Sequence, residues 1–560
     1  MSEIRNCKNC LKNYEIRDED FLFYDKVSSA SEGKNFLIPS PSFCPDCRRQ
    51  RRLAFRNERR LYRRECDLCK HKIISIYSPN NFYKVYCSSC WWSDKWDQLQ
   101  YGREFDFNKS FFEQFCELIK FAPRPALHVI NNENCDYVNQ CGYSKGCYLS
   151  YNCDYSENCF YCTNVIRSKD CLDLLDAENC ELCASGVALE NCYKTVNCFN
   201  CKNCHDIYFC RDLIGCADCF FCINLRNKKF CFKNEQLTKE EYERRVAEIK
   251  LNKFTDYQNC SEEILKFWLK YPHKYAEIVQ SENSSGDYLT NCRNSFYCFN
   301  SFKDQDVAYC TTLSNCKDTY DFDIGGYDCE LCYEMCSSGV QNYHCLFGAN
   351  YWGSCSEVLY SDIMFKDSFC FGCIALRNKN FCILNKQYSR SEYEQLVPKI
   401  IGHMQKEGEW GEFFPISISP FTYNETVAQE YFSLTKDEAL NKGYKWKDEE
   451  INERPIYTKV DVPEFIGDVS DDIVREILTC ESCGKNYKII PQELKFYREM
   501  NLPIPRKCPD CRHKERIALR NPRKLWKRNC MKCGVGIETT YAPAREEIVY
   551  CEKCYLESLE

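Results

Sequence analysis

The middle of the chain carries inward-facing residues with a period of three. Between residues 135 and 231 there are 18 cysteines, and each has a number divisible by three. An α-helix would repeat every 3.6 residues and a half-buried strand every two. A period of three therefore indicates short strands joined by tight corners. Asn precedes eight of these cysteines, and Asn tolerates the left-handed backbone that such corners need.

This pattern predicts a fold that is mainly β, a parallel β-solenoid with ladders of cysteine along its interior. A second copy follows at an offset of 151, so that Cys222–Arg226 (CINLR) matches Cys373–Arg377 (CIALR). The second copy has 12 cysteines, and insertions shift it off the grid of three. The cysteines alone leave the length of one turn open. They either pack as small apolar groups or form a metal- or sulfur-rich cluster.

Helical signals flank both copies. Capping boxes at Thr238…Glu241 and Ser389…Glu392 predict a helix after each solenoid. We expect these helices to cover the open ends, because an uncovered strand edge invites aggregation. A further helix is predicted over residues 109–121, where it would cover the entrance of the first solenoid.

Composition narrows the class of protein. Hydrophobic residues make up 44% and aromatic residues 15% of the 560, which is enough for packed cores and excludes a disordered or metallothionein-like chain. The sequence shows no leader-type apolar stretch and no apolar run near 18 residues, so we expect a cytoplasmic protein with reduced thiols and no membrane partner. No H-x-x-x-H pair and no glycine-rich phosphate loop occurs. These absences predict a non-enzymatic protein with no small-molecule substrate.

The two ends of the chain carry a different cysteine pattern, made of C-x-x-C knuckles. Two such turns complete a tetrahedral four-thiolate site, and a closed site of this kind is structural rather than catalytic. Eight knuckles predict four zinc ions per chain. The predicted ligands are Cys7, Cys10, Cys44, Cys47, Cys66, Cys69, Cys87, Cys90, Cys480, Cys483, Cys508, Cys511, Cys530, Cys533, Cys551 and Cys554. We pair the knuckles in sequence order, and a cross-braced order is the alternative.

The end modules are copies of each other and are the basic part of the chain. From Cys44 to Cys90 they align without a gap at an offset of 464. Residues 1–103 have 20 Lys and Arg against 13 Asp and Glu, and residues 480–560 have 17 against 11, giving +7 and +6. Since the whole chain carries −7, residues 104–479 carry −20.

An arginine-rich stretch joins the second and third knuckles of each module. Its shared basic positions are Arg48, Arg52, Arg56, Arg59, Arg60, Arg63 and Arg64, matched by Arg512, Arg516, Arg520, Arg523, Lys524, Lys527 and Arg528. Helical spacing would put 48, 52, 56, 59 and 63 on one face. In the second copy Pro522 predicts a break after Arg520 and a new helix capped by Asn521.

Such a face needs an anionic partner, because like charges at i,i+4 repel. The internal candidate is the thiolates of the zinc sites, and the external one is the phosphate backbone of a nucleic acid. Tyr62 and Trp526, at equivalent positions, would either stack on a base or pack beneath the helix.

The knuckle pattern C-x-x-C…C-P-D-C-R resembles the zinc-ribbon, treble-clef-like modules of many uncharacterised bacterial proteins. The whole layout, with ribbons around a Cys-rich repeat, resembles large uncharacterised proteins from small uncultivated bacteria, which imply no function. The resulting order is an N-terminal double zinc-ribbon module (1–103), a helical connector (104–130), the first Cys-rich solenoid (131–235), a helical cap and connector (236–282), the second solenoid (283–386), a helical cap and irregular linker (387–479) and a C-terminal double zinc-ribbon module (480–560).

The sequence thus predicts a zinc-binding scaffold whose arginine faces contact nucleic acid, and RNA more readily than a DNA sequence because no base-reading motif is present. Two alternatives remain open. One is a protein-interaction scaffold with purely structural zinc and a partner on the solenoid surface. The other is a metal-rich or redox protein that uses the solenoid cysteines.

Overall fold

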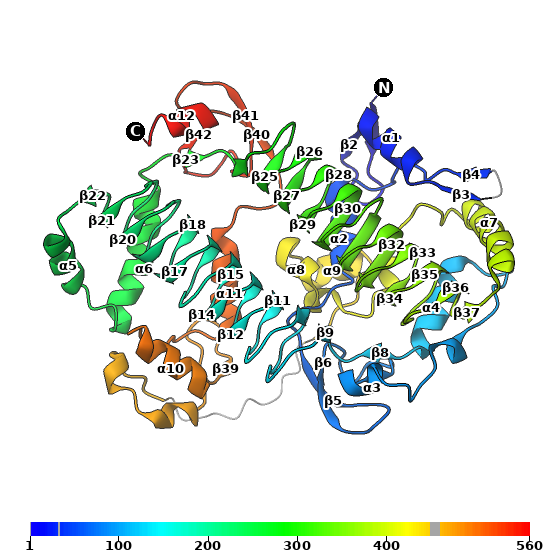
Figure 1. The fold of residues 1–560 in the computed structure, drawn as a ribbon, viewed down its shortest axis with the longest axis horizontal. Helices are drawn as coiled ribbons and strands as arrows, with labels where there is room; N and C mark the ends of the chain where they lie inside the picture. Colours follow the sequence, from blue (N-terminus) through cyan, green and yellow to red (C-terminus); the bar gives the residue numbers. More distant parts are fainter. Residues whose placement is uncertain (1, 32–33, 449–459, 560) are drawn as a thin grey trace. The chain divides into compact units, whose positions relative to one another are not determined.

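The computed structural model describes residues 2–31, 34–448 and 460–559, which divide into two compact units (Figure 1). The first unit comprises Met1–Leu127, Ala276–Glu449 and Arg523–Leu525. The second comprises His128–Tyr275, Glu450–Pro522 and Trp526–Glu560. Each unit therefore combines one solenoid with one knuckle module, and the N-terminal module shares its unit with the second solenoid of the chain.

The first solenoid is a stack of short parallel strands (Figure 1). Thr163 pairs with Tyr151 on one side and with Leu175 on the other. Equivalent positions on successive turns, such as Asn158 and Asp170, therefore differ by 12 in sequence number. The predicted β-solenoid is confirmed. Its strands are β9 (Val129–Ile130), β10 (Cys141–Gly142), β11 (Tyr151–Asp154), β12 (Glu157–Phe160), β13 (Thr163–Ile166), β14 (Lys169–Leu172), β15 (Leu175–Glu178), β16 (Val187–Glu190), β17 (Tyr193–Val196), β18 (Phe199–Lys202), β19 (His205–Tyr208), β20 (Ala217–Phe220), β21 (Lys229–Phe232) and β22 (Glu235–Gln236).

The period of three comes from a left-handed residue at each corner. Asn152, Tyr155 and Asn158 have φ angles of 55°, 53° and 50°, and the residue that follows each of them is inward-facing and buried. Because a corner recurs at every third position, each turn has four short sides. Corner side chains also pair between turns, as Asn158 Nδ2 donates to Asp170 Oδ1 at 2.8 Å.

The second solenoid has turns of unequal length. Side chains that bond between successive turns differ in sequence number by 11 for Asn283 and Asn294, by 12 for Asn294 and Asp306, and by 13 for Gln341 and Ser354. The unequal turns explain why this copy leaves the grid of three. Its strands are β24 (Ile278–Val279), β25 (Gly286–Thr290), β26 (Arg293–Phe296), β27 (Cys298–Phe302), β28 (Gln305–Ala308), β29 (Thr311–Ser314), β30 (Lys317–Gly326), β31 (Tyr333–Ser338), β32 (Tyr343–Tyr351), β33 (Ser356–Leu359), β34 (Asp362–Met364), β35 (Ser368–Phe371), β36 (Asn380–Ile383) and β37 (Lys386–Gln387).

A helix follows each solenoid, as the capping boxes predict. Helix α5 (Lys239–Ala247) begins after Thr238, and its Tyr242 ring lies 6.0 Å from the ring of Phe230 on β21. Helix α7 (Arg390–Glu407) begins after Ser389, and its Tyr393 ring lies 5.8 Å from the ring of Phe381 on β36. The last parallel strand of each stack also pairs with a short antiparallel strand, β22 or β37.

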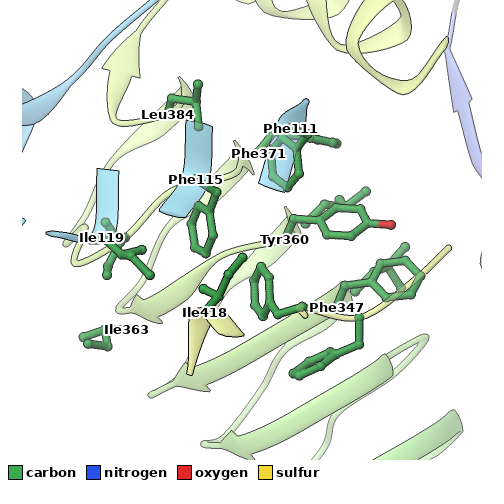
Figure 2. Packing of buried hydrophobic residues seen from close by; sticks show 14 of the residues in the cluster. Phe111, Phe115, Ile119, Phe347, Tyr360, Ile363, Phe371, Leu384 and Ile418 are labelled. Carbon is green, nitrogen blue, oxygen red and sulfur yellow. The ribbon is translucent and has the colours of Figure 1, made fainter. Parts of the chain in front are cut away.

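Helix α4 (Phe111–Phe121) forms where it is predicted but packs elsewhere. Ser110 caps it, and the Phe111 ring lies 5.4 Å from both the Tyr360 and the Phe371 rings of the second solenoid. Figure 2 shows Phe115 and Ile119 of the same helix in this cluster. The prediction that it covers the entrance of the first solenoid is wrong, because its apolar face is buried against the other repeat.

None of the described helices is long and apolar enough to cross a membrane. The remaining elements form the modules and the connectors. The N-terminal module and the segment after it contain β1 (Glu3–Asn6), β2 (Asn13–Ile16), α1 (Asp18–Lys26), β3 (Ser29–Ser31), β4 (Lys34–Phe36), α2 (Pro45–Leu53), β5 (Tyr62–Glu65), β6 (Lys72–Ser75), β7 (Val85–Tyr86), α3 (Ser88–Trp91), η1 (Gln98–Tyr101) and β8 (Arg124–Pro125). The C-terminal module contains β38 (Leu478–Thr479), β39 (Asn486–Tyr487), α10 (Pro491–Glu499), α11 (Pro509–Leu519), β40 (Trp526–Asn529), β41 (Gly536–Thr539), β42 (Val549–Tyr550) and α12 (Glu552–Leu556). The connectors contain α6 (Phe254–Trp268), β23 (His273–Lys274), η2 (Ile416–Ile418), η3 (Tyr423–Glu425), α8 (Val427–Tyr431), α9 (Lys436–Asn441), η4 (Ile466–Asp468) and η5 (Asp471–Val474).

Candidate metal centres and arginine–carboxylate clusters

The sixteen knuckle cysteines converge into four groups that could hold a metal ion. In each group the four sulfurs lie within 4.8 Å of one another. The groups join the first knuckle with the second and the third with the fourth in each module, which is the sequence order and not the cross-braced one. They are Cys7, Cys10, Cys44 and Cys47; Cys66, Cys69, Cys87 and Cys90; Cys480, Cys483, Cys508 and Cys511; and Cys530, Cys533, Cys551 and Cys554.

The sulfur spacing fits a tetrahedral ion. A tetrahedron with metal–sulfur bonds of about 2.3 Å has sulfurs roughly 3.8 Å apart. The distance between the Cys10 and Cys44 sulfurs is 3.7 Å, and that between the Cys69 and Cys87 sulfurs is 3.8 Å. In the C-terminal module the matching pairs, Cys483 with Cys508 and Cys533 with Cys551, are both 3.7 Å apart. Each group can therefore surround one ion with four thiolates and leave no position for water.

In each group hydrogen-bond donors favour the thiolate form of one cysteine, namely Cys7, Cys87, Cys480 or Cys530. The Cys44 N–H donates to the Cys7 sulfur at 3.2 Å, and the Cys551 N–H donates to the Cys530 sulfur at 3.3 Å. Burial raises the pKa of Cys530, but backbone N–H donors from Cys533 and Cys551 outweigh burial and lower the pKa to about 6. A lowered thiol pKa suits a metal ligand, because the thiolate is the form that binds.

In each module one four-cysteine group lies at the start of a helix that carries arginines. Cys44 is the N-cap of α2 and Cys508 is the N-cap of α11, each followed by Pro at the first helical position. Proline is pre-set for that position, so the ligand pair and the helix start are built by one local sequence, C-P-D-C-R. The four-cysteine group thereby sets the direction in which the helix leaves the knuckle.

The first arginine cluster lies between α2 and strands β30 and β31. Arg52 is fully buried, and its guanidinium is 3.0 Å from Asp321 and 2.8 Å from Asp323. The same group is 2.8 Å from Glu334. Arg48, one helical turn earlier, is 2.8 Å from Asp321. Both arginines therefore point into the solenoid wall and away from solvent.

Two more arginines of α2 complete this cluster. Arg49 is 3.3 Å from Asp323, and Arg51 is 3.3 Å from Glu334 and 3.0 Å from Glu412. Four arginines thus face four carboxylates. Burial alone would raise the pKa of Glu334, but Arg52, Arg51 and Arg48 outweigh burial and lower it. The carboxylate stays ionised and pairs with the helix.

The second unit repeats this arrangement with other carboxylates. Arg512 of α11 is 2.7 Å from Asp173 and 3.6 Å from Glu493, and Arg516 is 2.8 Å from Asp173. Arg520 pairs with Asp176. Asp173 is buried in the first solenoid, so here too the anionic partner is the wall of a repeat and not the thiolate group.

Each module also has a buried acidic residue that contacts its solenoid and that the sequence analysis did not identify. Asp20 and Glu493 each lie ten residues after the second cysteine of the first knuckle, and each is buried. Tyr309 of the second solenoid donates to Asp20 at 2.8 Å, and Tyr161 of the first donates to Glu493 at 2.7 Å. The signal was present as D-F-L-F-Y over 20–24 and E-L-K-F-Y over 493–497, outside the gap-free alignment.

The repeated CI-x-LR motif of the solenoids supplies a third anchor. Arg377 lies over the Trp91, Trp92 and Trp96 rings, at 5.1 Å from the last, and donates to the Ser93 carbonyl at 3.3 Å. Arg226, at the equivalent position, donates to the Tyr555 hydroxyl at 3.4 Å. Tyr555 and Trp91 match at the offset of 464. In both solenoids this arginine therefore contacts the last knuckle of a module.

These positions correct the predicted arginine face. Helix α2 ends at Leu53 and α11 at Leu519, and the chain resumes as strands β5 and β40, so no long cationic helix forms and none restarts at Asn521. Arg48, Arg52, Arg56, Arg512 and Arg516 are buried, which leaves them no access to a phosphate backbone.

The other predicted contact residues differ in how far they are buried. Arg56 donates to Glu58 and Ser337, Arg64 to Asp67, Arg528 to the Ala542 carbonyl, and Arg523, which belongs to the first unit, to Thr312. Arg59 is partly buried, and Arg60, Arg63, Lys524 and Lys527 are exposed. Tyr62 donates to Glu425 and lies under Lys447, so its ring has internal contacts.

Comparison of the chain with protein-family models and with curated proteins finds no match.

Proposed function

We propose that this protein is a non-enzymatic scaffold in which zinc-ribbon modules hold two solenoids, and in which the outer solenoid faces bind a partner protein. The observation that carries the proposal is the burial of Arg48 and Arg52, and of Arg512 and Arg516, in ion pairs with solenoid carboxylates. An arginine that is buried in ion pairs inside the fold is not available to an external ligand.

The chemistry of the thiol groups supports zinc as the metal. Sites with four thiolates, tetrahedral spacing and no open position are typical of structural zinc. A chain with 48 cysteines and metal-type C-x-x-C pairs is typical of a reducing compartment, so we propose a cytoplasmic location. Four ions per chain would fix the knuckles from which α2 and α11 begin.

The charge of the chain favours a protein partner over nucleic acid. Residues 104–479, which include both solenoids, carry −20. The module arginines neutralise part of this charge, and the remainder repels a phosphate backbone. The solenoid faces also expose aromatic rings, such as Tyr143 and Tyr155, which stack at 5.1 Å. Exposed aromatic groups are common in protein interfaces.

Nucleic-acid contact remains a second candidate, on a smaller surface than the sequence predicts. The residues that favour it are the exposed Arg60 and Arg63 near β5 and the exposed Lys524 and Lys527 near β40. A contact of this kind would use few phosphates and would therefore depend only modestly on salt.

Crosslinking of the full-length protein in its own cells tests these candidates. We expect chemical crosslinking to join solenoid residues to a discrete protein, and ultraviolet crosslinking to attach no nucleic acid above background. A variant with Arg60→Glu and Arg63→Glu should keep the protein crosslinks, as should the matched surface change Lys495→Glu. Nucleic acid that crosslinks to the wild type and to Lys495→Glu, but not to the double variant, would replace the proposal with the second candidate.

Metal analysis tests the zinc part of the proposal. We expect the purified protein to carry about four zinc ions, one for each four-thiolate site. Removal of the metal by a chelator should change the fluorescence of Trp91, Trp92 and Trp96, which lie at the last N-terminal knuckle, while the β-signal of the solenoids persists. A protein that folds fully without metal, or that carries iron in these sites, contradicts the proposed structural zinc.

A further inference from the structure

The interior of the first solenoid contains a continuous network of thiols. Cys147 lies one turn from both Cys135 and Cys159, and Cys171 lies one turn from Cys159 and Cys183, all within one packed cluster. The path continues across a corner from Cys183 to Cys180 and then along the next column. The further members of the connected network are Cys162, Cys192, Cys198, Cys201, Cys204, Cys210, Cys216, Cys219, Cys222 and Cys231.

The network follows the turns of the solenoid. Cys135, Cys147, Cys159, Cys171 and Cys183 occupy one column over five successive turns, and Cys159 pairs in register with Cys171. Neighbouring strands lie about 4.8 Å apart, which sets the spacing of stacked side chains. Two metal–sulfur bonds of about 2.3 Å placed end to end span roughly 4.6 Å. A cation with two opposite sulfur ligands therefore fits between thiols of successive turns.

The charge balance inside the column selects the class of cation. A buried thiolate without a counter-charge is costly, and burial raises the pKa of Cys171 and Cys210 well above the ordinary value. A monovalent ion placed between each pair of stacked thiolates neutralises one thiolate per ion. A divalent zinc ion prefers four ligands in a tetrahedron, and among the described residues only the knuckle cysteines form such groups.

We propose that the interior of the first solenoid binds soft monovalent metal ions, of which copper(I) is the biological example, between the thiolates of successive turns. Each ion replaces the proton of one thiol, forms one sulfur–copper bond to it and takes a lone pair from the sulfur of the next turn. One proton leaves to solvent per ion, and no electron is transferred. Soft thiolate ligands select copper(I) over harder cations.

The end of the column gives the ions a route. Cys135 lies in the first turns of the solenoid and is only partly buried, and the Cys147 N–H donates to its sulfur at 3.3 Å. An ion bound at Cys135 can pass from one thiol to the next, because the thiols of the column are stacked on successive turns in one packed cluster. This role goes beyond the structural zinc sites, since it uses a different set of cysteines.

The second solenoid is an internal control. Its in-register columns are interrupted by larger side chains, as Phe322 and Met335, which pair with each other, are both fully buried in its core. Cys298 lies next to Cys310, and Cys370 lies next to Cys373 and Cys382. The longest run among the described residues of this solenoid has four thiols, Cys316, Cys329, Cys332 and Cys345, and is shorter than the network of the first solenoid. Copper uptake should therefore concentrate in the first solenoid.

The test uses the full-length zinc-loaded protein without oxygen and adds copper(I) as its acetonitrile complex. We expect copper to bind in addition to the zinc, and X-ray absorption at the copper edge to show two sulfur neighbours. In the variant Cys147→Ser with Cys171→Ser, copper uptake should fall, because each serine interrupts two successive thiol pairs. Serine already occupies inward positions at 144, 156 and 168, so this variant keeps the natural chemistry of the core.

The matched control is Cys116→Ser with Cys260→Ser, which removes two cysteines on helices α4 and α6. Its copper uptake should equal that of the wild type, and circular dichroism should show the same fold for all three proteins. Copper that binds only by displacing zinc overturns the proposal. So does uptake by the Cys147/Cys171 variant equal to that of the control.

Discussion

Arg52 lies out of water between three carboxylates, and its charge is neutralised by groups that are as buried as it is. Taking charges out of water is costly, and only the mutual attraction of the partners offsets that cost. Burial alone would lower the pKa of Arg52, yet Asp323, Glu334 and Asp321 raise it above the ordinary value. The guanidinium therefore stays charged, and its loss would leave the buried cluster with four carboxylates and only three arginines.

We predict that Arg52→Ala lowers the free energy of unfolding of its unit by about 3–5 kcal/mol, the usual cost of an uncompensated buried charge. The exposed Arg63 lies in the same module, and Arg63→Ala should change stability by no more than about 0.5 kcal/mol. Urea unfolding followed by far-ultraviolet circular dichroism measures both. Equal shifts for the two variants would contradict the role given to the cluster.

Asp304 is a buried acid at an inward position of the second solenoid. Its exposed fraction is 1%, and it accepts a hydrogen bond from the Cys316 N–H at 2.8 Å. Burial raises its pKa to about 7, more than its hydrogen bonds lower it. The folded chain therefore holds a proton on Asp304 at a pH where the unfolded chain has already released it.

We predict that this group makes the protein less stable as the pH rises. Its contribution is fully present below the ordinary carboxyl pKa of 3.8 and is lost as the pH rises through about 7. Urea midpoints measured from pH 4 to 8 should fall more steeply for the wild type than for Asp304→Asn. Asp328→Asn, at an exposed site, should follow the wild type, and parallel curves for all three proteins would contradict the assignment.

At the scale of single elements, each side of the solenoid depends on its corner residue. The side ends in a left-handed backbone, and Asn191 has a φ of 52° at an exposed corner. Its Nδ2 donates to the Asn203 Oδ1 of the next turn at 3.0 Å. Asn and Gly adopt this conformation readily, whereas a β-branched residue is strained in it.

We predict that Asn191→Val destabilises the second unit by about 1–2 kcal/mol relative to Asn191→Gly. Both variants lose the same amide hydrogen bond, so the difference between them isolates the backbone strain. Urea unfolding of the two full-length variants gives the comparison directly. If valine is tolerated as well as glycine, the left-handed corner is not what limits this turn.

At the scale of the whole molecule, each unit is assembled from segments far apart in sequence. The partners Arg52 and Asp323 are separated by 271 residues, and Arg512 and Asp173 by 339. Contacts of this kind form only after long loops have closed, whereas each turn of a solenoid pairs with the turn next to it in sequence. The repeats can therefore form locally, and each module docks against a wall that already exists.

Features that depend on local spacing could be read from the sequence without a structure. The period of three predicted the solenoid, because every inward residue follows its own left-handed corner. The C-x-x-C spacing predicted that the sixteen knuckle cysteines form four groups. Thr238 and Ser389 predicted the starts of α5 and α7. Each of these signals lies within a few residues of the structure that it specifies.

The pairing of modules with solenoids became visible only in the folded chain. The two modules and the two solenoids carry nearly the same motifs, so local pattern does not say which module packs on which repeat or where α4 lies. The partners of the arginines were hidden for the same reason, since Asp321 and Asp173 look like ordinary corner residues until a helix from elsewhere in the chain reaches them. Complementary charge and shape between segments far apart in sequence determine which module packs on which solenoid, and local spacing carries no information about them.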